Sequence, residues 1–348
     1  MADFRRGERG GIAVLLAIVM VALLGFTAFA VDVGMVYSER AQLQNGADSA
    51  AMGVAQTCAK RGPAAQCSES EIEPLAMSLA NPNALDNLVN LEPTPAIPSP
   101  IALDTANRTV TVTPGAQEVG KEANKVTTFF AGALGIPSMQ VQAKATVQWG
   151  SPIKGTAPFP MAISVCQVET MVDGSVQLLQ SHGANKNPDC IDTQSGSTVP
   201  GGFAWLTSDP GICGALVDLE VDEGASDPGN NAPPGCADRL NGWATDMNAG
   251  KQVVVFLPVY TSVTGTGSGA TYNVNSFAAL EVHGWKFSGN STLPDTFQNR
   301  NPPQTTANEC RGDCRGIIGK FITYTSLADG FELGDVSDHG ATIVQYVP

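Results

Sequence analysis

Hydrophobic residues are concentrated in one uninterrupted run near the N-terminus. From Gly11 to Val31 the chain carries no charged residue and consists mainly of Ile, Val, Leu, Ala and Phe. A helix of about 20 apolar residues crosses the hydrocarbon core of a bilayer, so the run predicts a transmembrane helix. The alternative is a secretory signal cleaved after Ala30, because Ala28-Phe29-Ala30 matches an A-x-A cleavage site. The run is longer than the apolar part of most signals, and helical sequence continues past the site, which favours a retained anchor.

Basic residues flank this run unequally. Arg5, Arg6 and Arg9 precede it, whereas Arg40 is the only basic residue between it and Lys60. Positive side chains are enriched on the cytoplasmic side of membrane segments. We therefore expect residues 1–10 in the cytoplasm, residues 11–31 in the membrane, and the rest of a single-pass cell-membrane protein outside the cytoplasm.

After the run, residues 32–60 predict a stalk helix. The segment contains no proline, and apolar side chains recur at three- and four-residue spacing, which is the period of one helix face. These side chains belong to Leu43, Ala47, Ala50, Ala51 and Val54. Small side chains permit close packing, so this stripe has two interpretations. It is buried against the protein's own outer domain, which we favour, or it is an interface for a partner helix.

The N-terminal residues resemble a known family. The resemblance is carried by Arg9-Gly10-Gly11, the apolar run, Ala30-Val31-Asp32-Val33-Gly34, Tyr37, Leu43-Gln44-Asn45 and Ala47-Asp48-Ser49-Ala50-Ala51. They are similar to the N-terminal module of TadG-like (TadE/TadG-like) proteins, in which R-G, a transmembrane helix, D-x-G and L-Q-x-A-x-D-A-A-A follow one another. The resemblance implies a component of the tight-adherence (Flp-type) pilus assembly system. Its implied partners are the membrane and other pilus-assembly or envelope proteins.

Later segments bear on the same resemblance. Phe129-Phe130-Ala131-Gly132 and the string from Cys310 to Gly316 are similar to an actinobacterial subset of the family. Some members carry a von Willebrand A domain with a D-x-S-x-S metal site. The nearest string here, Asp173-Gly174-Ser175-Val176-Gln177, lacks the second serine, so metal-dependent adhesion is not expected. A pilin is also disfavoured, because Leu15 or Leu16 stands where pilins place a glutamate inside the apolar run.

The composition changes after the stalk. Prolines are dense between residues 61 and 105, where they predict a connector with a short helix over Ser70–Leu79 and a stiff, extended stretch from Pro93 to Pro100. Residues 106–150 predict a small β-α-β unit, with strands over 109–113 and 140–149 and a helix over 118–134.

Residues 151–348 are expected to form a β-rich extracytoplasmic domain. Strands are predicted over 253–260, 277–287, 317–324 and 342–347, and Gly265 to Gly269 predicts a hairpin loop. Pro258 indicates a sheet edge or a bulge. The fold class is therefore α+β, with a transmembrane and stalk helix followed by a β-rich, disulfide-stapled domain.

The eight cysteines all lie outside the apolar run, at Cys58, Cys67, Cys166, Cys190, Cys213, Cys236, Cys310 and Cys314. An even count in an exported domain indicates disulfides, and sequence neighbours suggest the pairs 58–67, 166–190, 213–236 and 310–314. The connectivity stays open at this point, because eight cysteines allow 105 pairings. A zinc site is disfavoured because only Cys310 and Cys314 are close together and none of His182, His283 and His339 lies beside a cysteine cluster.

The remaining chemistry is sparse. A formal net charge of −14 argues against nucleic-acid binding. The chain has no G-x-S-x-G, H-E-x-x-H or Walker sequence, so neither an enzyme nor a cofactor is expected. The acidic string from Asp218 to Asp227 starts like a calcium loop, but Glu223 occupies the position that needs glycine. Arg311-Gly312-Asp313 between two cysteines predicts a tight disulfide turn rather than an adhesion motif.

We therefore expect a membrane-anchored accessory or structural component of Flp-type pilus assembly. The alternative is an extracytoplasmic adhesin or ligand-binding module unrelated to pili. Self-association into a homo-oligomer is left open.

Overall fold

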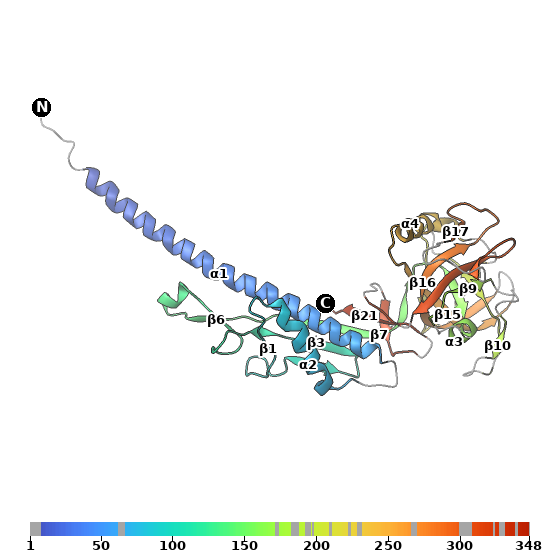
Figure 1. The fold of residues 1–348 in the computed structure, drawn as a ribbon, viewed down its shortest axis with the longest axis horizontal. Coiled ribbons are helices and arrows are strands. Elements are labelled where there is room, and N and C mark those ends of the chain that lie inside the picture. Colours follow the sequence, from blue (N-terminus) through green and yellow to red (C-terminus); the bar gives the residue numbers. More distant parts are fainter. Residues whose placement is uncertain are drawn as a thin grey trace, which may run out of the picture. The chain divides into compact units, whose positions relative to one another are not determined.

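The computed structural model describes residues 8–61, 67–170, 174–181, 188–191, 196, 198–208, 211–221, 224–227, 232–265, 270–298, 308–322, 324–326, 331–337 and 340–347. The chain divides into two compact units. Unit 1 comprises Met1–Ala55, Cys67–Gln148 and Tyr346–Pro348, and unit 2 comprises Gln56–Gln66 and Trp149–Gln345. The elements are helices and strands in separate stretches of sequence, so the predicted α+β class is confirmed (Figure 1).

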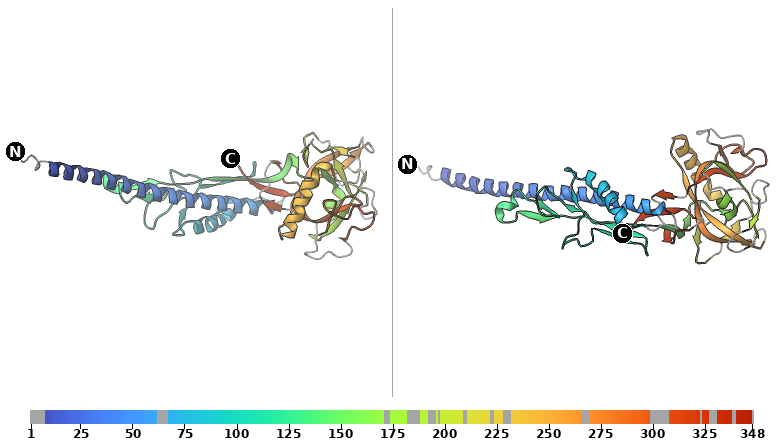
Figure 2. Two further views of the ribbon diagram at one scale, coloured as in Figure 1. Left: turned by 90° about the horizontal axis from the view of Figure 1, so that it is seen from above. Right: turned by 60° about the horizontal axis from the view of Figure 1, so that its bottom comes forward.

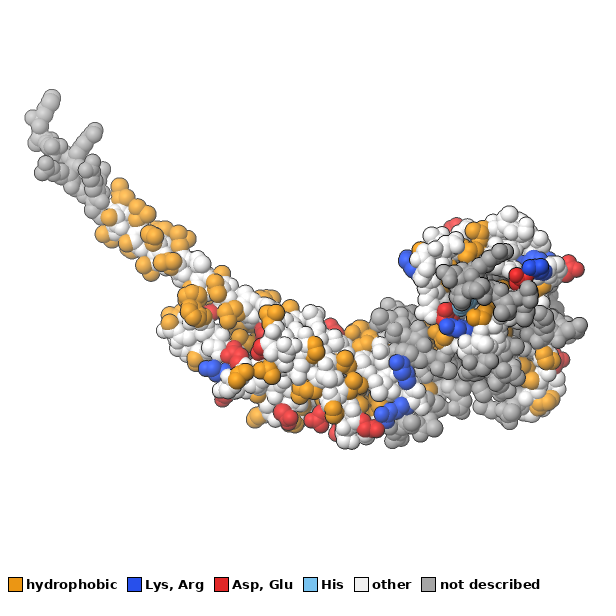
Figure 3. Space-filling model, in the orientation of Figure 1, with side chains coloured by type: hydrophobic (Ala, Val, Ile, Leu, Met, Phe, Trp, Pro, Cys, Tyr) orange, Lys and Arg blue, Asp and Glu red, His pale blue; other side chains and the backbone are white. Residues whose placement is uncertain are grey.

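Helix α1 (Glu8–Ala59) is one continuous element of 52 residues. At 1.5 Å per residue it is about 78 Å long. It is the one helix among the described residues that is long and apolar enough to cross a membrane. Every described side chain from Ile12 to Thr27 is exposed in the isolated chain, and in Figure 3 hydrophobic side chains cover this part of the helix. The predicted continuity of the apolar run with the stalk is confirmed.

A second helix packs closely on the stalk. Helix α2 (Glu69–Ala80) lies in the predicted connector, where the sequence indicated a short helix. A Cβ atom on Gly46 would lie 3.2 Å from the carbonyl oxygen of Ala80, and one on Gly53 would overlap Leu79 Cδ1. Glycine therefore allows the two helices to approach, as small residues do in close helix pairs. The short 3-10 helix η1 (Asn81–Asn83) follows α2.

The strands of unit 1 form three small groups. Strand β2 (Ile101–Asp104) pairs antiparallel with β3 (Thr109–Val112), and β3 pairs with the first four residues of β7 (Ala145–Ala157). Alternate residues from Val141 to Trp149 are buried, which confirms the period of two that the sequence shows. Strands β1 (Val89–Asn90) and β4 (Gly115–Ala116) form a second pair, and β5 (Lys125–Thr127) and β6 (Ser138–Gln140) form a third.

The helix predicted over residues 118–134 is wrong. The segment contains strand β5 and the four-residue 3-10 helix η2 (Ala131–Leu134) instead. Gly120 and Asn124 adopt positive φ values of 71° and 65°, which a right-handed helix cannot accommodate. The β-branched residues that follow Lys125 favour a strand. The expected β-α-β unit therefore contains a β-hairpin in place of its helix.

Unit 2 is built on an eight-stranded sheet. Its main path runs β14 (Gly224–Asp227), β12 (Phe203–Leu206), β8 (Met161–Ser164), β15 (Val254–Thr264), β16 (Thr271–Lys286), β18 (Gly316–Ile322) and β9 (Gln177–Gln180), with β17 (Thr296–Gln298) beside β16. Strand β14 also pairs with β16, so five of these strands close into a ring. All pairs are antiparallel except β8 with β15.

The strands predicted in this region are present. Residues 253–260, 277–287 and 342–347 correspond to parts of β15, β16 and β21 (Thr342–Tyr346), and 317–322 fall in β18; residue 323 lies outside the described chain. The end of β15 pairs with the start of β16, Thr264 opposite Thr271, as in the predicted hairpin. Pro258 pairs with Phe277 inside the sheet, and register shifts follow at once, between Val259 and Ser262. A bulge, rather than an edge position, thus accompanies this proline.

The other elements of unit 2 are short. Strands β13 (Ala215–Asp218) and β20 (Phe331–Gly334) pair with the second half of β7, and β19 (Tyr324–Ser326) pairs parallel with β21. Strands β10 (Cys190–Ile191) and β11 (Thr198–Val199) form a small hairpin, and helix α3 (Val165–Thr170) and the 3-10 helix η3 (Pro234–Cys236) complete the set.

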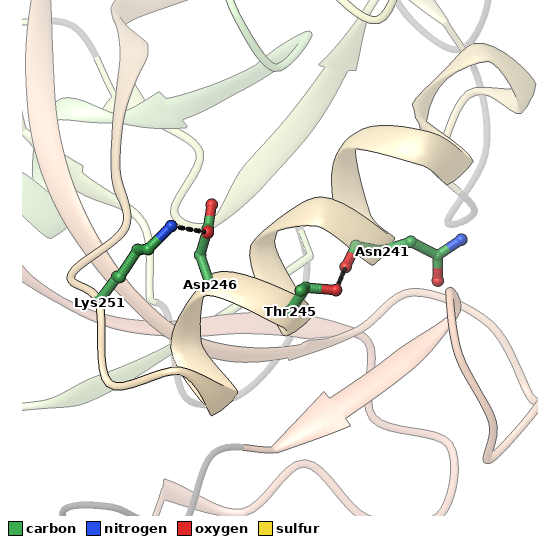
Figure 4. Close-up of polar contacts among 4 residues, drawn as sticks. All are labelled: Asn241, Thr245, Asp246 and Lys251. Carbon is green, nitrogen blue, oxygen red and sulfur yellow. Dashed lines mark hydrogen bonds and ion pairs between the residues drawn. The ribbon is translucent and has the colours of Figure 1, made fainter.

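The core of unit 2 is aromatic, and one helix covers part of it. Phe159 packs 5.3 Å from Trp205 and 5.0 Å from Trp243, measured between ring centroids. Trp243 belongs to helix α4 (Ala237–Asn248), which buries residues at the spacing of one helix face. Its opposite face is polar: Thr245 Oγ1 donates to the Asn241 carbonyl at 2.9 Å, and Lys251 binds Asp246 at 2.9 Å (Figure 4). In Figure 2, α4 is the gold helix beside the strands of the eight-stranded sheet.

Four disulfides staple the chain. Bonds join Cys166 to Cys190, Cys213 to Cys236 and Cys310 to Cys314, and Cys58 and Cys67 are the other two disulfide-bonded cysteines. No free cysteine occurs in the described chain, whose ranges include all eight. The three bonds named first join neighbours in sequence. The predicted disulfide-stapled domain is confirmed.

These bonds should stabilise the protein according to the length of chain they close. Cysteines 213 and 236 are 23 residues apart, whereas 310 and 314 are 4 apart. Loop entropy predicts that the double substitution Cys213→Ala/Cys236→Ala lowers the free energy of unfolding by about 3 kcal/mol, against about 2 kcal/mol for Cys310→Ala/Cys314→Ala. Denaturant unfolding of both variants measures the difference. A larger loss for the short loop would show that loop entropy does not govern these bonds.

Candidate functional site

The five stripe residues of α1 lie in the interior of unit 1. Leu43, Ala47, Ala50, Ala51 and Val54 are each 0% exposed. The sequence leaves two interpretations of the stripe open. Burial against the chain's own domain requires these side chains to be inaccessible in the single chain, as they are. A partner helix at the same side chains would have to displace part of unit 1. The stripe therefore acts, in the single chain, as the surface on which the stalk packs.

Polar side chains of α1 also bind the strands and loops around it. Gln44 Nε2 donates to the carbonyl of Lys144 at 3.2 Å and to Asp48 Oδ1 at 3.0 Å. Gln42 Oε1 accepts the backbone N–H of Leu85 at 2.7 Å. These contacts fix the turn that carries Leu85 and the chain before β7 to defined positions along the helix.

The most concentrated polar contact of the stalk is made by Asp32. This residue is the first after the apolar run, yet it is only 3% exposed. Oδ1 accepts the backbone N–H of Phe129 at 2.8 Å, and Oδ2 accepts that of Phe130 at 3.0 Å. The N–H of Ala131 also donates to Oδ2. One carboxylate thus binds three consecutive N–H groups almost a hundred residues away in sequence.

The segment that Asp32 binds is the tip of the β5–β6 hairpin. The three N–H groups stand at the start of η2, where the first N–H groups of a helical turn have no partner within the turn. The tip closes on itself, since Ile136 N donates to the Ala131 carbonyl at 3.0 Å and Thr128 N donates to the Pro137 carbonyl at 3.1 Å. Asp32 therefore supplies from another element the acceptor that an N-cap side chain normally supplies locally. Figure 1 shows the hairpin containing β6 beside α1.

The hydrogen bonds also control the charge of this carboxylate. Burial by itself would raise the pKa of Asp32, because it disfavours the ionised form. The N–H groups of Ala131, Phe130 and Phe129 act in the opposite direction, and together they hold the pKa below its usual value. The ionised form is the one that can accept all three bonds. Near neutral pH the helix therefore holds the hairpin by a charge-assisted contact.

Residues 10–57 match a family described as "Putative Flp pilus-assembly TadE/G-like". The match falls on α1, from the start of the apolar segment to the end of the stalk, and includes Asp32 and the buried stripe. It supports a pilus-related role and an association with the membrane and with envelope or pilus proteins. Comparison with curated proteins and with solved structures found no match.

Together the apolar helix and the disulfides indicate a single-pass membrane protein with an extracytoplasmic domain. The helix is long enough to span and is exposed where it leaves unit 1. Disulfides form and persist in oxidising compartments outside the cytoplasm.

The histidines do not form a shared site within the described chain. His182 and His339 lie outside the described residues, and His283 sits on β16 with its side chain 8% exposed. Its Nε2 lies 3.2 Å from Glu281 Oε1, and Glu281 also binds Lys320 at 2.8 Å and Gln252 at 2.7 Å. Glu281 is thus held by three neighbouring side chains.

Two other strings of interest have structural roles where they are described. Asp218, which begins the acidic string, pairs with Lys154 at 2.8 Å; residues 222 and 223 lie outside the described chain, and so does Asp173 of the string compared with D-x-S-x-S. Arg311 pairs with Glu309, and Cys314 N donates to the Arg311 carbonyl at 3.2 Å. No group of three or more metal-binding side chains occurs among the described residues.

Sequence reasoning missed the link between Asp32 and the hairpin tip. The sequence places Asp32 in D-x-G and Phe129 to Gly132 in a later resemblance, but nothing in the sequence connects the two segments. One local signal is that no charged residue occurs between Lys125 and Lys144, but it is not specific, because residues 252–280 carry none either. An uncharged, glycine-containing stretch interrupted by two phenylalanines is a poor helix and a good loop tip.

Asp32→Asn should release the hairpin tip. The amide keeps the shape of the carboxylate but replaces one acceptor oxygen with a donor, so one or two of the three N–H groups lose their partner. Amide hydrogen exchange of peptides covering residues 129–131 should become roughly tenfold faster. Peptides of unit 2 serve as the internal control. Unchanged exchange at residues 129–131 would show that Asp32 does not hold the tip.

His283 should make unit 2 less stable in mild acid. Burial lowers the pKa of His283, the Glu281 carboxylate opposes this and the charge of Lys320 adds to it. As the pH falls, His283 is therefore protonated in the unfolded chain before it is protonated in the folded chain. The stability that depends on a neutral His283 is fully present above the unfolded pKa of about 6.5 and is lost as the pH falls below it. Denaturant unfolding at a series of pH values should show a decline below that pH that is smaller in His283→Gln. Equal slopes in the two proteins would contradict the assignment.

Proposed function

We propose that this protein is a membrane-anchored accessory or structural component of Flp-type (tight-adherence) pilus assembly, without catalytic activity. The observation that carries the proposal is the family match over residues 10–57, which coincides with the spanning and stalk parts of one continuous helix. The proposed role is mechanical: α1 is fixed in the membrane at one end and in unit 1 at the other. We also propose that the chain is one of an actinobacterial subset of TadG-like proteins, because its later segments are similar to that subset.

The proposed orientation places the N-terminus in the cytoplasm. Three arginines precede the apolar run, and one basic residue separates it from Lys60. The disulfides on the other side of the run agree with this direction, because they require an oxidising compartment. Unit 2, together with the folded part of unit 1, would then face the envelope proteins or the pilus machinery as partners.

Removal of the gene and return of altered forms test the proposal. The deletion strain should lose surface pili, and the full chain should restore them. A form in which residues 8–31 are replaced by a cleavable signal should be exported, folded and without free thiols, yet should fail to restore pili because it is not anchored. Pili are counted by electron microscopy. A deletion strain with normal pili and reduced surface adhesion would instead favour an adhesin unrelated to pili.

A further inference from the structure

The hairpin tip held by Asp32 carries an exposed apolar surface. We define the hairpin tip as residues 128–139. Its large apolar side chains point into open space in the isolated chain, and the exposed fractions are 76% for Phe129, 40% for Phe130, 85% for Leu134, 52% for Ile136 and 43% for Met139. The rings of Phe129 and Phe130 pack edge to face with centroids 4.8 Å apart. No charged residue lies among them. Apolar surface gathered in this way marks a site of interaction rather than ordinary surface.

The position of the tip along α1 indicates which environment contacts this apolar surface. Asp32 follows the last residue of the apolar run directly, and it binds three N–H groups of the tip. Ala28 lies four residues earlier, on the same face of the helix. It is the first residue of the described run with a partly buried side chain, whereas residues 12–27 are all exposed. Unit 1 therefore covers α1 as far as the last turn of the membrane segment.

We propose that the hairpin tip inserts into the lipid bilayer at the interface on the side of the folded domain, so that the protein contacts the membrane at two places. Insertion of the tip requires that α1 spans the membrane, and it does not depend on a role in pili. If the run ending at Val31 occupies the hydrocarbon, Asp32 lies at its border and the tip lies at the same level. The uncharged tip can enter that layer, where aromatic and aliphatic side chains are favoured. Its backbone is compatible with this position, because Asp32 satisfies the three N–H groups that would otherwise be exposed to lipid.

Two contacts with the membrane constrain the orientation of unit 1 more than a single contact does. A single helix can tilt and rotate in a bilayer, since tilt is set by neighbouring protein and by interfacial anchors. A second contact beside the helix removes rotation about its axis. Unit 1 would then present a constant face away from the membrane. Asp32 is the positioning residue of this arrangement, because it joins the tip to the span.

Tryptophan fluorescence of the full chain in lipid nanodiscs tests the inference. Phe129→Trp reports on the tip, Val21→Trp reports on the centre of the span, and Leu85→Trp is the matched control. Leu85 is 87% exposed, and its N–H binds Gln42, ten residues beyond Asp32 along α1. The native tryptophans are all buried, so their signal is subtracted as background from the wild type. Quenchers are lipids with a spin label near the headgroup or near the chain end, and iodide in the water.

The expected pattern separates the three positions. Trp at 129 should be quenched more strongly by the headgroup-proximal label than by the deep one, and only weakly by iodide. Trp at 21 should show the reverse order of lipid labels, and Trp at 85 should respond to iodide alone. Adding Asp32→Asn to Phe129→Trp should restore quenching by iodide, because the tip is no longer held at the border.

Three results would overturn the inference. The tip is in water if Trp at 129 behaves like Trp at 85. It is covered by protein, such as a second copy of the chain, if Trp at 129 is protected from iodide and from both lipid labels. Absence of lipid quenching at position 21 would show that α1 does not span the membrane, which the proposal requires. The first two results leave the proposed role in pili untouched, whereas the third also removes the anchored form on which that role depends.

Discussion

The carboxylate of Asp32 is the contact on which the arrangement of unit 1 depends. It is buried in the middle of α1, directly after the apolar run, where a charge is unfavourable unless it is compensated. Three backbone N–H groups provide that compensation. The same groups need an acceptor, because they begin a short 3-10 turn. Helix and hairpin thus satisfy each other's polar groups, and neither can move away without leaving buried groups unpaired.

Packing along the rest of the stalk follows from side-chain size. Beyond Asp32 the helix buries small residues and brings α2 close through Gly46 and Gly53. Alanine and glycine on a buried face contribute little apolar area individually, but they allow backbones to approach and make many contacts at short range. The N-terminal half of α1 is therefore exposed and apolar, suited to lipid, whereas the C-terminal half packs one face on protein. The transition between these halves occurs near Asp32.

Much of the fold could be predicted from the sequence because its signals are local. The continuous helix, the short helix α2 and the strands β15, β16 and β18 follow from periodicity and from proline and glycine positions. The contact of Asp32 with the hairpin could not be found in this way, because it joins residues 97 to 99 positions apart. The helix expected over 118–134 failed for a related reason. Its residues have mixed propensities, and the strand conformation of Lys125 to Thr127 is stabilised by pairing with the distant residues Ser138 to Gln140.

The central claim is that an ionised Asp32 joins the membrane helix to the hairpin tip. Nuclear magnetic resonance of the full chain in nanodiscs, with Asp32 labelled at its carboxyl carbon, tests it directly as the pH is lowered. The account predicts a pKa for Asp32 below the ordinary value of an aspartate, and a change in the amide signals of Phe129, Phe130 and Ala131 with the same midpoint. A pKa at or above the ordinary value, or amide signals that do not follow the titration, would contradict the account.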